Sequence, residues 1–302
     1  MSNDLSATKI DVDLFDLKHT FESAQPLTFH ADYDERINSI LYTSGKSIIN
    51  MGQAGTSKNP NLVVVSDDIK FAISDVTKRF RLKDNMRQVY KEINTDKFMA
   101  RAIKDYEGMR LTLNDPWETT VCYIISQFNN VKRIRGIIRS MINKFGTDVY
   151  KNGSFVTKSF PSSETLMNAS IKELMSCGTG FRGKYIKSAA EYCTNNLDLY
   201  KLNPNNYDNL KEKLMEIDGV GDKVADCIVL MGYGNMQACP IDVWVKRTIE
   251  KIYFKSKEKK IDYIHEFVED RWGKKYLGYA QQYIFWGGRQ MEDEAKEYLL
   301  VK

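Results

Sequence analysis

Hydrophobic residues in the first 74 positions alternate with polar ones or gather in short runs. The strand-like segments are residues 11–17, 36–42, 47–50, 61–65 and 71–73. Such segments predict β-strands, because successive side chains of a strand point to opposite faces of a sheet. The polar stretch at 52–60 is expected to be a loop. Residues 1–74 are therefore expected to form an antiparallel sheet module.

From residue 75 onward the hydrophobic residues repeat at helical spacing. A helix start is predicted at Asp115, which precedes Pro116 and Glu118, because aspartate caps free backbone N–H groups and proline suits the first helical position. Further helical segments are expected at 131–145, 207–233, 261–268 and 278–286. The predicted fold class is α+β, mostly α, with residues 75–302 forming a helical region behind the sheet module.

Residues 207–233 predict two helices joined by a tight turn. Leu210, Leu214 and Ile217 share one helix face, and a second apolar face follows the turn. Gly219 and Gly221 lie between the two, since glycine favours sharp turns. Backbone N–H groups at such a turn attract anions, and glycine has no side chain that would obstruct a phosphate. The segment is either a site that reads a nucleic-acid backbone or an ordinary helical hairpin.

Lys223 and Asp242 are the candidate catalytic residues. Lys223 is expected in the first turn of the second helix, where the helix dipole and partial burial would lower the pKa of its ammonium group. A lysine with a lowered pKa is a usable nucleophile. Asp242 follows Pro240 at an expected helix start, so its carboxylate can cap the helix, take part in catalysis, or do both.

Composition narrows the class of protein further. The 302 residues carry a net charge of +4, so any basic surface for nucleic acid must be local. The five cysteines include no Cys-x-x-Cys pair, which indicates neither a zinc site nor an iron–sulfur cluster and suggests free thiols in a reducing compartment. No signal peptide and no apolar run of about 18 residues is visible. An intracellular protein without a metal cofactor is expected.

Two segments together resemble a known family. They are Glu-Ile-Asp-Gly-Val-Gly-Asp-Lys-Val-Ala-Asp-Cys-Ile at 216–228 and Cys-Pro-Ile-Asp-Val at 239–243. This pattern resembles the helix-hairpin-helix Gly-Pro-Asp (HhH-GPD) signature of DNA glycosylases, and it is most similar to the 8-oxoguanine DNA glycosylases. The resemblance implies a helical body of two subdomains behind the sheet module. It also implies base excision followed by strand cleavage through a Schiff base on Lys223, with Asp242 stabilising the developing positive charge.

The resemblance has further implications for partners and location. The expected partner is double-stranded DNA that contains 8-oxoguanine, bound by a monomer that has no contact with a membrane. A structural alkali cation at the hairpin is expected as in relatives. The protein would reside in the cytoplasm or nucleoid of a bacterium, or in the nucleus of a eukaryote.

A pocket for the damaged base is also implied by the resemblance. Ala24 would offer its backbone carbonyl to the lesion, and Cys227, Gln281 and Phe285 would enclose the base. Gln281 and Phe285 are four residues apart and therefore share one helix face. Without the resemblance, Phe285 would be interpreted as a core residue and the segment around Ala24 as a turn between strands.

Contacts to the DNA around this pocket are assigned in the same way. The residues are Asn130, Arg133, Phe181, Arg182, Gly219, Gly221 and Trp244. The basic helix at 131–145 is either DNA-facing or simply solvated, and Phe181 is either a wedge in the duplex or a packed loop residue. Phe128 and Phe181 replace polar residues of relatives near the base opposite the lesion. A weaker preference for cytosine at that position is therefore expected.

Two other functions remain open from the sequence alone. A monofunctional glycosylase for another damaged base commonly uses water and would not need Lys223. A non-catalytic helix-hairpin-helix DNA-binding protein would need neither Lys223 nor Asp242. Nicking of a duplex that contains 8-oxoguanine distinguishes the three readings.

Overall fold

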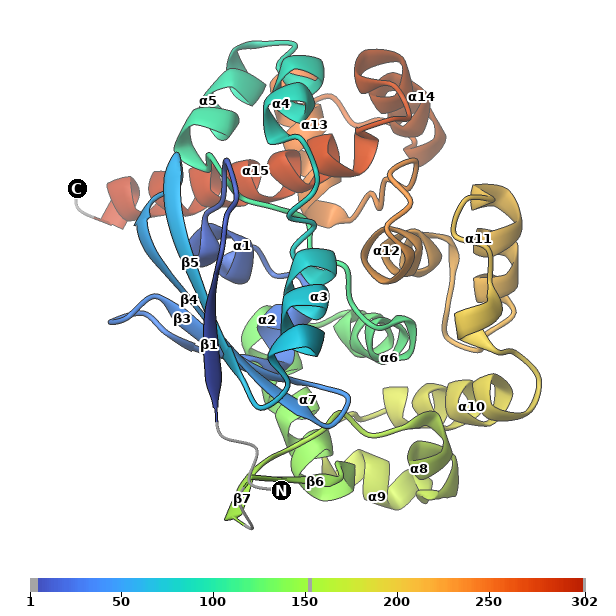
Figure 1. Ribbon diagram of the computed structural model, residues 1–302. Helices are drawn as coiled ribbons and strands as arrows, with labels where there is room; N and C mark the ends of the chain where they lie inside the picture. The colour runs from blue at the N-terminus through green and yellow to red at the C-terminus, as the bar shows by residue number, and fades with distance from the viewer. Residues whose placement is uncertain (1–4, 152–153, 301–302) are drawn as a thin grey trace.

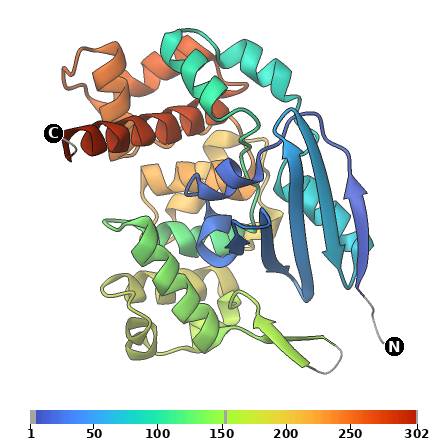
Figure 2. The same cartoon turned by 90° about the vertical axis from the view of Figure 1, so that its left-hand side faces the viewer.

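Five antiparallel strands form the N-terminal sheet in the computed structural model, which describes residues 5–151 and 154–300. The strands are β1 (Ser6–Ile10), β2 (Asp32–Asp34), β3 (Ser39–Ser44), β4 (Ser47–Thr56) and β5 (Asn59–Ser66). Their spatial order is β1-β5-β4-β3-β2. Figures 1 and 2 show this sheet on one side of the molecule, with most of the helices beside it.

A small core covers one face of the sheet. Ile40 on β3, Met51 on β4 and Val64 on β5 pair across the strands, and all three are fully buried. Helix α3 (Ile69–Arg79) packs against the sheet and contributes Val76 to the same core. The expected division after residue 74 falls inside α3, so the N-terminal core continues beyond that position.

The segment 11–17 is not a strand, in contrast to its alternating pattern. The side-chain amide of Gln53, and not a neighbouring strand, forms hydrogen bonds with the backbone of this segment. It accepts one from the N–H of Leu17 (2.7 Å) and donates one to the carbonyl of Phe15 (2.9 Å). Phe15 and Leu17 are nevertheless buried, which explains the hydrophobic alternation. Two short helices follow, α1 (Leu17–Glu22) and α2 (Pro26–His30).

Residues 71–73 and 52–60 also differ from the prediction. Asp68 accepts a hydrogen bond from the backbone N–H of Phe71 at 3.0 Å, which caps α3 and makes 71–73 helical. Residues 52–60 are not a loop, because β4 and β5 continue through them and meet at a short turn at 57–58. The structure of these two segments is thus set by an aspartate cap and by a long hairpin. Neither feature can be recognised from the spacing of hydrophobic residues.

The rest of the chain is mostly helical, as expected. Its helices are α4 (Met86–Ile93), α5 (Lys97–Asp105), α6 (Pro116–Ser126), α7 (Val131–Phe145), α8 (Ser163–Asn168), α9 (Ile171–Ser176), α10 (Arg182–Asn195), η1 (Leu199–Lys201), α11 (Tyr207–Met215), α12 (Asp222–Tyr233), α13 (Val243–Tyr253), α14 (Ile261–Trp272) and α15 (Leu277–Leu300). A two-stranded hairpin, β6 (Asp148–Lys151) with β7 (Ser154–Lys158), interrupts this body, a feature that the hydrophobic spacing did not predict. Among the described residues, no helix is both long and apolar enough to cross a membrane.

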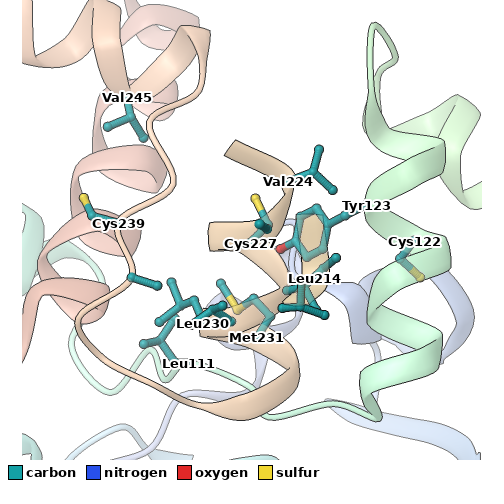
Figure 3. Packing of buried hydrophobic residues seen from close by; sticks show 14 of the residues in the cluster. Leu111, Cys122, Tyr123, Leu214, Val224, Cys227, Leu230, Met231, Cys239 and Val245 are labelled. Carbon is teal, nitrogen blue, oxygen red and sulfur yellow. The ribbon is translucent and has the colours of Figure 1, made fainter. Parts of the chain in front are cut away.

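Helices α6 and α12 lie in the middle of the larger core. Tyr123 on α6, Leu214 on α11, and Cys227 and Met231 on α12 are all buried, and Figure 3 shows their side chains gathered between these helices. Close packing of this kind leaves little freedom to the helix axes. The core therefore fixes α12, the helix that carries Lys223.

The N-terminal unit is attached to the helical body through α2, which packs against α6 and α7. Two arginines of α7 reach back to the end of α2. Arg135 donates to the carbonyl of Ala31 at 3.1 Å, and Arg139 forms an ion pair with Asp32. Part of the basic side of α7 therefore forms contacts within the protein. The sequence analysis expected this side to face either DNA or solvent.

Candidate active site

The turn between α11 and α12 is a tight hairpin built around two glycines. Gly219 has φ +85°, and a Cβ at this position would lie 2.8 Å from the Cβ of Tyr185, so both the conformation and the space require glycine. The N–H of Val220 bonds to the carbonyl of Ile217 at 2.9 Å and closes the turn. Gly221 precedes α12, and apart from the glycine and its chain neighbours no described atom lies within 4 Å of the position of a Cβ there. The hairpin is open enough for a phosphate to approach its backbone.

Lys223 and Asp242 come from different helices and line the same cavity. Lys223 is the second residue of α12, as predicted. Asp242 is the N-cap of α13, and its carboxylate accepts a hydrogen bond from the N–H of Val245 at 2.8 Å. The capping role leaves the carboxylate at the cavity wall, so a second role there is compatible with the geometry.

The pKa of Lys223 is shifted in the direction opposite to the prediction, which was a lowered value. It is raised, chiefly by the sulfur of Cys227, which is also its hydrogen-bond partner, and further by the carboxylate of Asp242, while burial acts in the opposite direction. Burial raises the pKa of the Cys227 thiol to about 12. Burial also raises the pKa of Asp242, against the hydrogen bond from Val245 and the charge of Lys223. The influence of Cys227 and Asp242 thus exceeds that of burial, and the ammonium form of Lys223 is favoured.

The cavity has a volume of about 320 Å³ and contains all four residues expected to hold a base: Ala24, Cys227, Gln281 and Phe285. Gln281 is buried and donates from Nε2 to the carbonyl of Pro240 at 3.1 Å. Its Oε1 has no hydrogen-bond partner among the described residues. A buried polar atom without a partner is costly, so this oxygen is suited to a donor on a ligand.

Ala24 is held in a conformation that is uncommon for a residue with a side chain. Its φ is +58°, in the left-handed region. The neighbouring Gln25 is buried, and its amide bonds the backbone of Arg110 (2.9 Å) and Thr112 (2.6 Å). Gln282 on α15 donates to the carbonyl of Ser23 at 2.9 Å. These bonds on both sides fix the Ala24 backbone at the cavity wall.

A second loop, 127–130, lies between α6 and α7 and presents an exposed ring. Phe128 is 94% exposed with φ +49°. Arg182 is only 3% exposed, and its guanidinium group donates to the carbonyls of Gln127 and Phe128. Gln127 in turn donates from Nε2 to the carbonyl of Gly219 at 2.9 Å. Arg182 therefore supports this loop from inside, in contrast to the direct DNA contact expected for it.

The other expected DNA contacts lie on accessible positions. Asn130 and Arg133 are exposed at the start of α7, where Asn130 caps the helix by accepting the N–H of Arg133 at 3.0 Å. Phe181 is 53% exposed in the turn before α10. Asn130 and Trp244 line the cavity, whereas Arg133, Phe181 and the two hairpin glycines lie outside it.

Arg289 and Gln127 are among the residues near this site that were not anticipated from the sequence. Arg289 lines the cavity, and Gln127 joins the loop 127–130 to the hairpin. Arg289 is eight positions after Gln281 on the same helix, so helical spacing alone would have suggested it. No sequence signal indicates Gln127, because its partner, Gly219, is 92 residues away.

One group of possible metal ligands lies near the hairpin, formed by Asp222, Asp226 and His265. The ammonium group of Lys211 already lies 2.8 Å from the carboxylate of Asp222 and 3.1 Å from that of Asp226. The hydroxyl of Tyr207 also donates to Asp226 at 2.7 Å. This cluster is satisfied by the protein itself, and it stabilises the packing of α11 on α12.

The fold and the cavity together define the class of helix-hairpin-helix proteins with a lysine and a carboxylate beside the hairpin. Residues 121–274 match the family described as HhH-GPD superfamily base excision DNA repair protein. Residues 7–120 match the family described as 8-oxoguanine DNA glycosylase, N-terminal domain. The first match spans slightly more than half of the chain. The chain therefore belongs to the HhH-GPD superfamily of base excision DNA repair proteins.

Curated relatives agree with this assignment. The chain is 28% identical over 242 residues to the N-glycosylase/DNA lyase of Saccharomyces cerevisiae, a match that covers 69% of this chain and 64% of the yeast protein. It is 29% identical over 231 residues to a probable N-glycosylase/DNA lyase of Methanothermobacter thermautotrophicus, covering 68% and 71% of the two chains.

Solved structures with the same fold cover nearly the whole chain. A structure of MBOgg1 with a low-affinity DNA ligand superposes with a TM-score of 0.83 at 30% identity, covering 95% of this chain and 96% of that one. The Clostridium acetobutylicum 8-oxoguanine glycosylase/lyase, bound to double-stranded DNA with cytosine opposite 8-oxoguanine, gives a TM-score of 0.81 at 25% identity, covering 97% and 100%. The N-terminal sheet and the helical body therefore occur together in these relatives.

Proposed function

We propose that this protein is a bifunctional DNA glycosylase that removes 8-oxoguanine from duplex DNA and then cleaves the strand. The observation that carries the proposal is a single cavity that contains Lys223, Asp242 and the unpartnered amide oxygen of Gln281. A lysine and a carboxylate are the groups that a glycosylase with lyase activity needs, and the amide can bind the donor edge of a purine. The relatives named above support both the reaction and the substrate.

The base end of the cavity would bind the everted 8-oxoguanine. The carbonyl of Ala24, fixed by its neighbours, would accept a hydrogen bond from the N7–H group that distinguishes 8-oxoguanine from guanine. Gln281 would pair with the Watson–Crick edge, and Phe285 would stack on the ring. Enclosure of the base between these groups holds the sugar next to Lys223, which reduces the entropy lost in the reaction.

Lys223 would attack C1′ as the bond from C1′ to the base breaks. The electron pair of that bond leaves with the base, and the base takes up a proton. The carboxylate of Asp242 stabilises the positive charge that develops on the sugar. Lys223 must lose a proton before it attacks; Asp242, whose pKa is raised, would accept this proton and pass it to the departing base, which returns Asp242 to the carboxylate form.

Strand cleavage would follow from the bond between Lys223 and the sugar. The C1′–O4′ bond then breaks, the ring oxygen takes up the proton lost from the attached nitrogen, and the nitrogen lone pair forms a protonated Schiff base with C1′. The Schiff base withdraws electrons, so a proton is lost from C2′ and the 3′ phosphate departs by β-elimination. No electron acceptor is required in this sequence.

The hairpin would hold a DNA phosphate outside the cavity. Main-chain carbonyls are its available oxygen ligands, and the open space at Gly221 would admit an alkali cation. Such a cation would add positive charge at the phosphate, and it takes no part in bond breaking. We further propose that the protein acts as a monomer in the compartment that holds the genome.

Borohydride trapping tests the proposal. The protein is incubated with a duplex containing 8-oxoguanine in the presence of borohydride, and we expect a covalent protein–DNA product together with base release. Lys223→Gln should abolish trapping and retain DNA binding, whereas Asp242→Asn should slow base release at least tenfold. Base release without trapping would instead identify a monofunctional glycosylase, and binding without either would identify a DNA-binding protein.

A further inference from the structure

Arg289 is a charged residue in the cavity that the proposed reaction does not yet use. It follows Gln281 and Phe285 on α15 at intervals of four residues, so the three side chains lie in a row along one helix face. The spacing from Gln281 to Arg289 corresponds to about 12 Å along the helix axis. Burial decreases along this row, from the buried Gln281 to the half-buried Phe285 and Arg289. Arg289 therefore lies toward the mouth of the cavity.

The surroundings of Arg289 are aromatic and carry charges of both signs, because Asp242 and Arg247 both lie near it. Its guanidinium carbon lies 5.7 Å from the centroid of the Trp244 ring, and that of Arg247 lies 5.4 Å from the same ring. Trp244 is the second residue of α13, so this cluster is at the positive end of the dipole of an 11-residue helix. The face of an indole ring attracts a guanidinium group within about 6 Å, so Trp244 helps to hold Arg289 in place.

The order of groups along α15 matches the order of groups in a nucleotide. Under the proposed function, Gln281 meets the edge of the base and Phe285 its ring, and Lys223 and Asp242 lie at the sugar. The next group outward is a phosphate, which is an anion that a guanidinium binds with two parallel hydrogen bonds. The unpartnered oxygen of the buried Gln281 is an independent indication, within the described part of the chain, that a ligand enters this cavity.

We propose that Arg289, held over the ring of Trp244, is a positioning residue that binds a phosphate flanking the everted nucleotide. The inference rests on the proposed function, because it places the nucleotide in the cavity. It adds a contact that holds the sugar against Lys223 and Asp242. The positive charge of Arg289 also favours the ionised form of Asp242, since it lowers the pKa of that carboxyl.

Salt-dependent DNA binding tests this contact. The probe is a duplex with a tetrahydrofuran abasic-site analogue, which offers the backbone without a base. Each phosphate contact contributes about 0.9 to the slope of log affinity against log salt concentration. Arg289→Gln should therefore lower the slope by about 0.9 and weaken binding at low salt about tenfold. Arg289→Lys should restore most of the slope and only part of the affinity, because it keeps the charge but loses the planar geometry.

A matched control separates a specific contact from a general loss of charge. Arg36 is exposed and lies outside the cavity, so Arg36→Gln should leave the slope unchanged. An unchanged slope in Arg289→Gln, with a thermal transition like that of the wild type, would overturn the inference. A lowered slope in a protein that does not excise 8-oxoguanine would support the phosphate contact and refute the proposed function.

Discussion

Lys223 shows how immediate neighbours decide the chemistry of one residue. Its position at the start of α12 favours the neutral amine, because the helix dipole repels a positive charge there. Cys227, one turn further on the same helix, and Asp242, from α13, act in the opposite direction and raise its pKa. The amine is therefore stored as an ammonium group. In the proposed reaction it becomes a nucleophile after it gives a proton to Asp242.

The left-handed backbone of Ala24 leads to a prediction at the same scale. A β-branched residue fits this conformation poorly. Ala24→Val should lower the free energy of unfolding by about 1–2 kcal/mol and slow excision of 8-oxoguanine, because the carbonyl moves. Urea unfolding and single-turnover excision measure the two effects. Ala54→Val, at an exposed strand position where valine is well accommodated, is the control; equal behaviour of both variants would contradict the role given to Ala24.

Phe128 and Phe181 lead to a prediction about the opposite base. Both rings are exposed and neither offers a strong hydrogen-bonding group to cytosine. We expect excision rates within about tenfold for the four bases opposite 8-oxoguanine, since a polar contact that would discriminate among them is worth about 1–3 kcal/mol per base. Restoring polar groups with Phe128→Asn should increase the preference for cytosine. A strong cytosine preference in the wild type would refute the expectation.

At the scale of elements, three loops are joined to one another beside the cavity. Tyr185, at the start of α10, packs against Gly219 of the hairpin, and its ring lies 6.3 Å from the centroid of Phe181. The loop 127–130 is connected to the same hairpin by Gln127 and to α10 by Arg182. The hairpin is therefore in contact with both segments that carry the exposed rings.

Removal of the Gln127 amide tests this linkage. Gln127→Ala deletes the 2.9 Å hydrogen bond to the carbonyl of Gly219. A bond of this kind contributes about 1 kcal/mol, so excision should slow about fivefold, with little change in the thermal transition. Gln88→Ala is the matched control, because Gln88 bonds an exposed neighbour, Glu92, within α4. Equal excision rates in the two variants would show that the loop positions itself without the hairpin.

At the scale of the whole molecule, a buried charge network stabilises the N-terminal unit. The carboxylate of Asp75 on α3 accepts hydrogen bonds from Tyr42 (2.8 Å), Ser44 (2.6 Å) and Arg79 (3.0 Å). Burial alone would raise the pKa of Asp75, but the charge and hydrogen bonds of Arg79, with those of Ser44 and Tyr42, lower it below 3.8. Arg79 is almost completely buried, so it depends on this carboxylate.

Asp75→Asn should therefore lower the free energy of unfolding by about 3–5 kcal/mol at pH 7, because it leaves the buried Arg79 without its counter-charge. A carboxyl with a lowered folded-state pKa stabilises the protein above pH 3.8 and loses this effect as the pH falls through the folded-state value. The difference between wild type and variant should thus shrink below pH 3.8. Urea unfolding at pH 7 and pH 3 measures it. Asp34→Asn, which removes an exposed ion pair with Arg36, should change neither value detectably.

Local signals in the sequence determined much of the molecule. Helix caps such as Asp115 and Asp242, the glycines of the hairpin and the apolar spacing around them predicted α6, α11, α12 and α13, because these features act within a few residues of one another. The candidate catalytic pair and the four pocket residues were predicted through motifs and family resemblance, and the fold brings all six to one cavity.

Only the tertiary structure decided the rest, since it depends on partners that are distant in the chain. The segment 11–17 has the alternation of a strand, but Gln53 satisfies its backbone. Arg182 has the charge of a DNA contact, but the carbonyls of loop 127–130 bind it inside the protein. The place of Arg289 beside Trp244 likewise follows from contacts between separate helices. The spacing of hydrophobic residues indicates which face of a helix or strand is buried. It does not indicate which side chain of another helix or strand contacts that face.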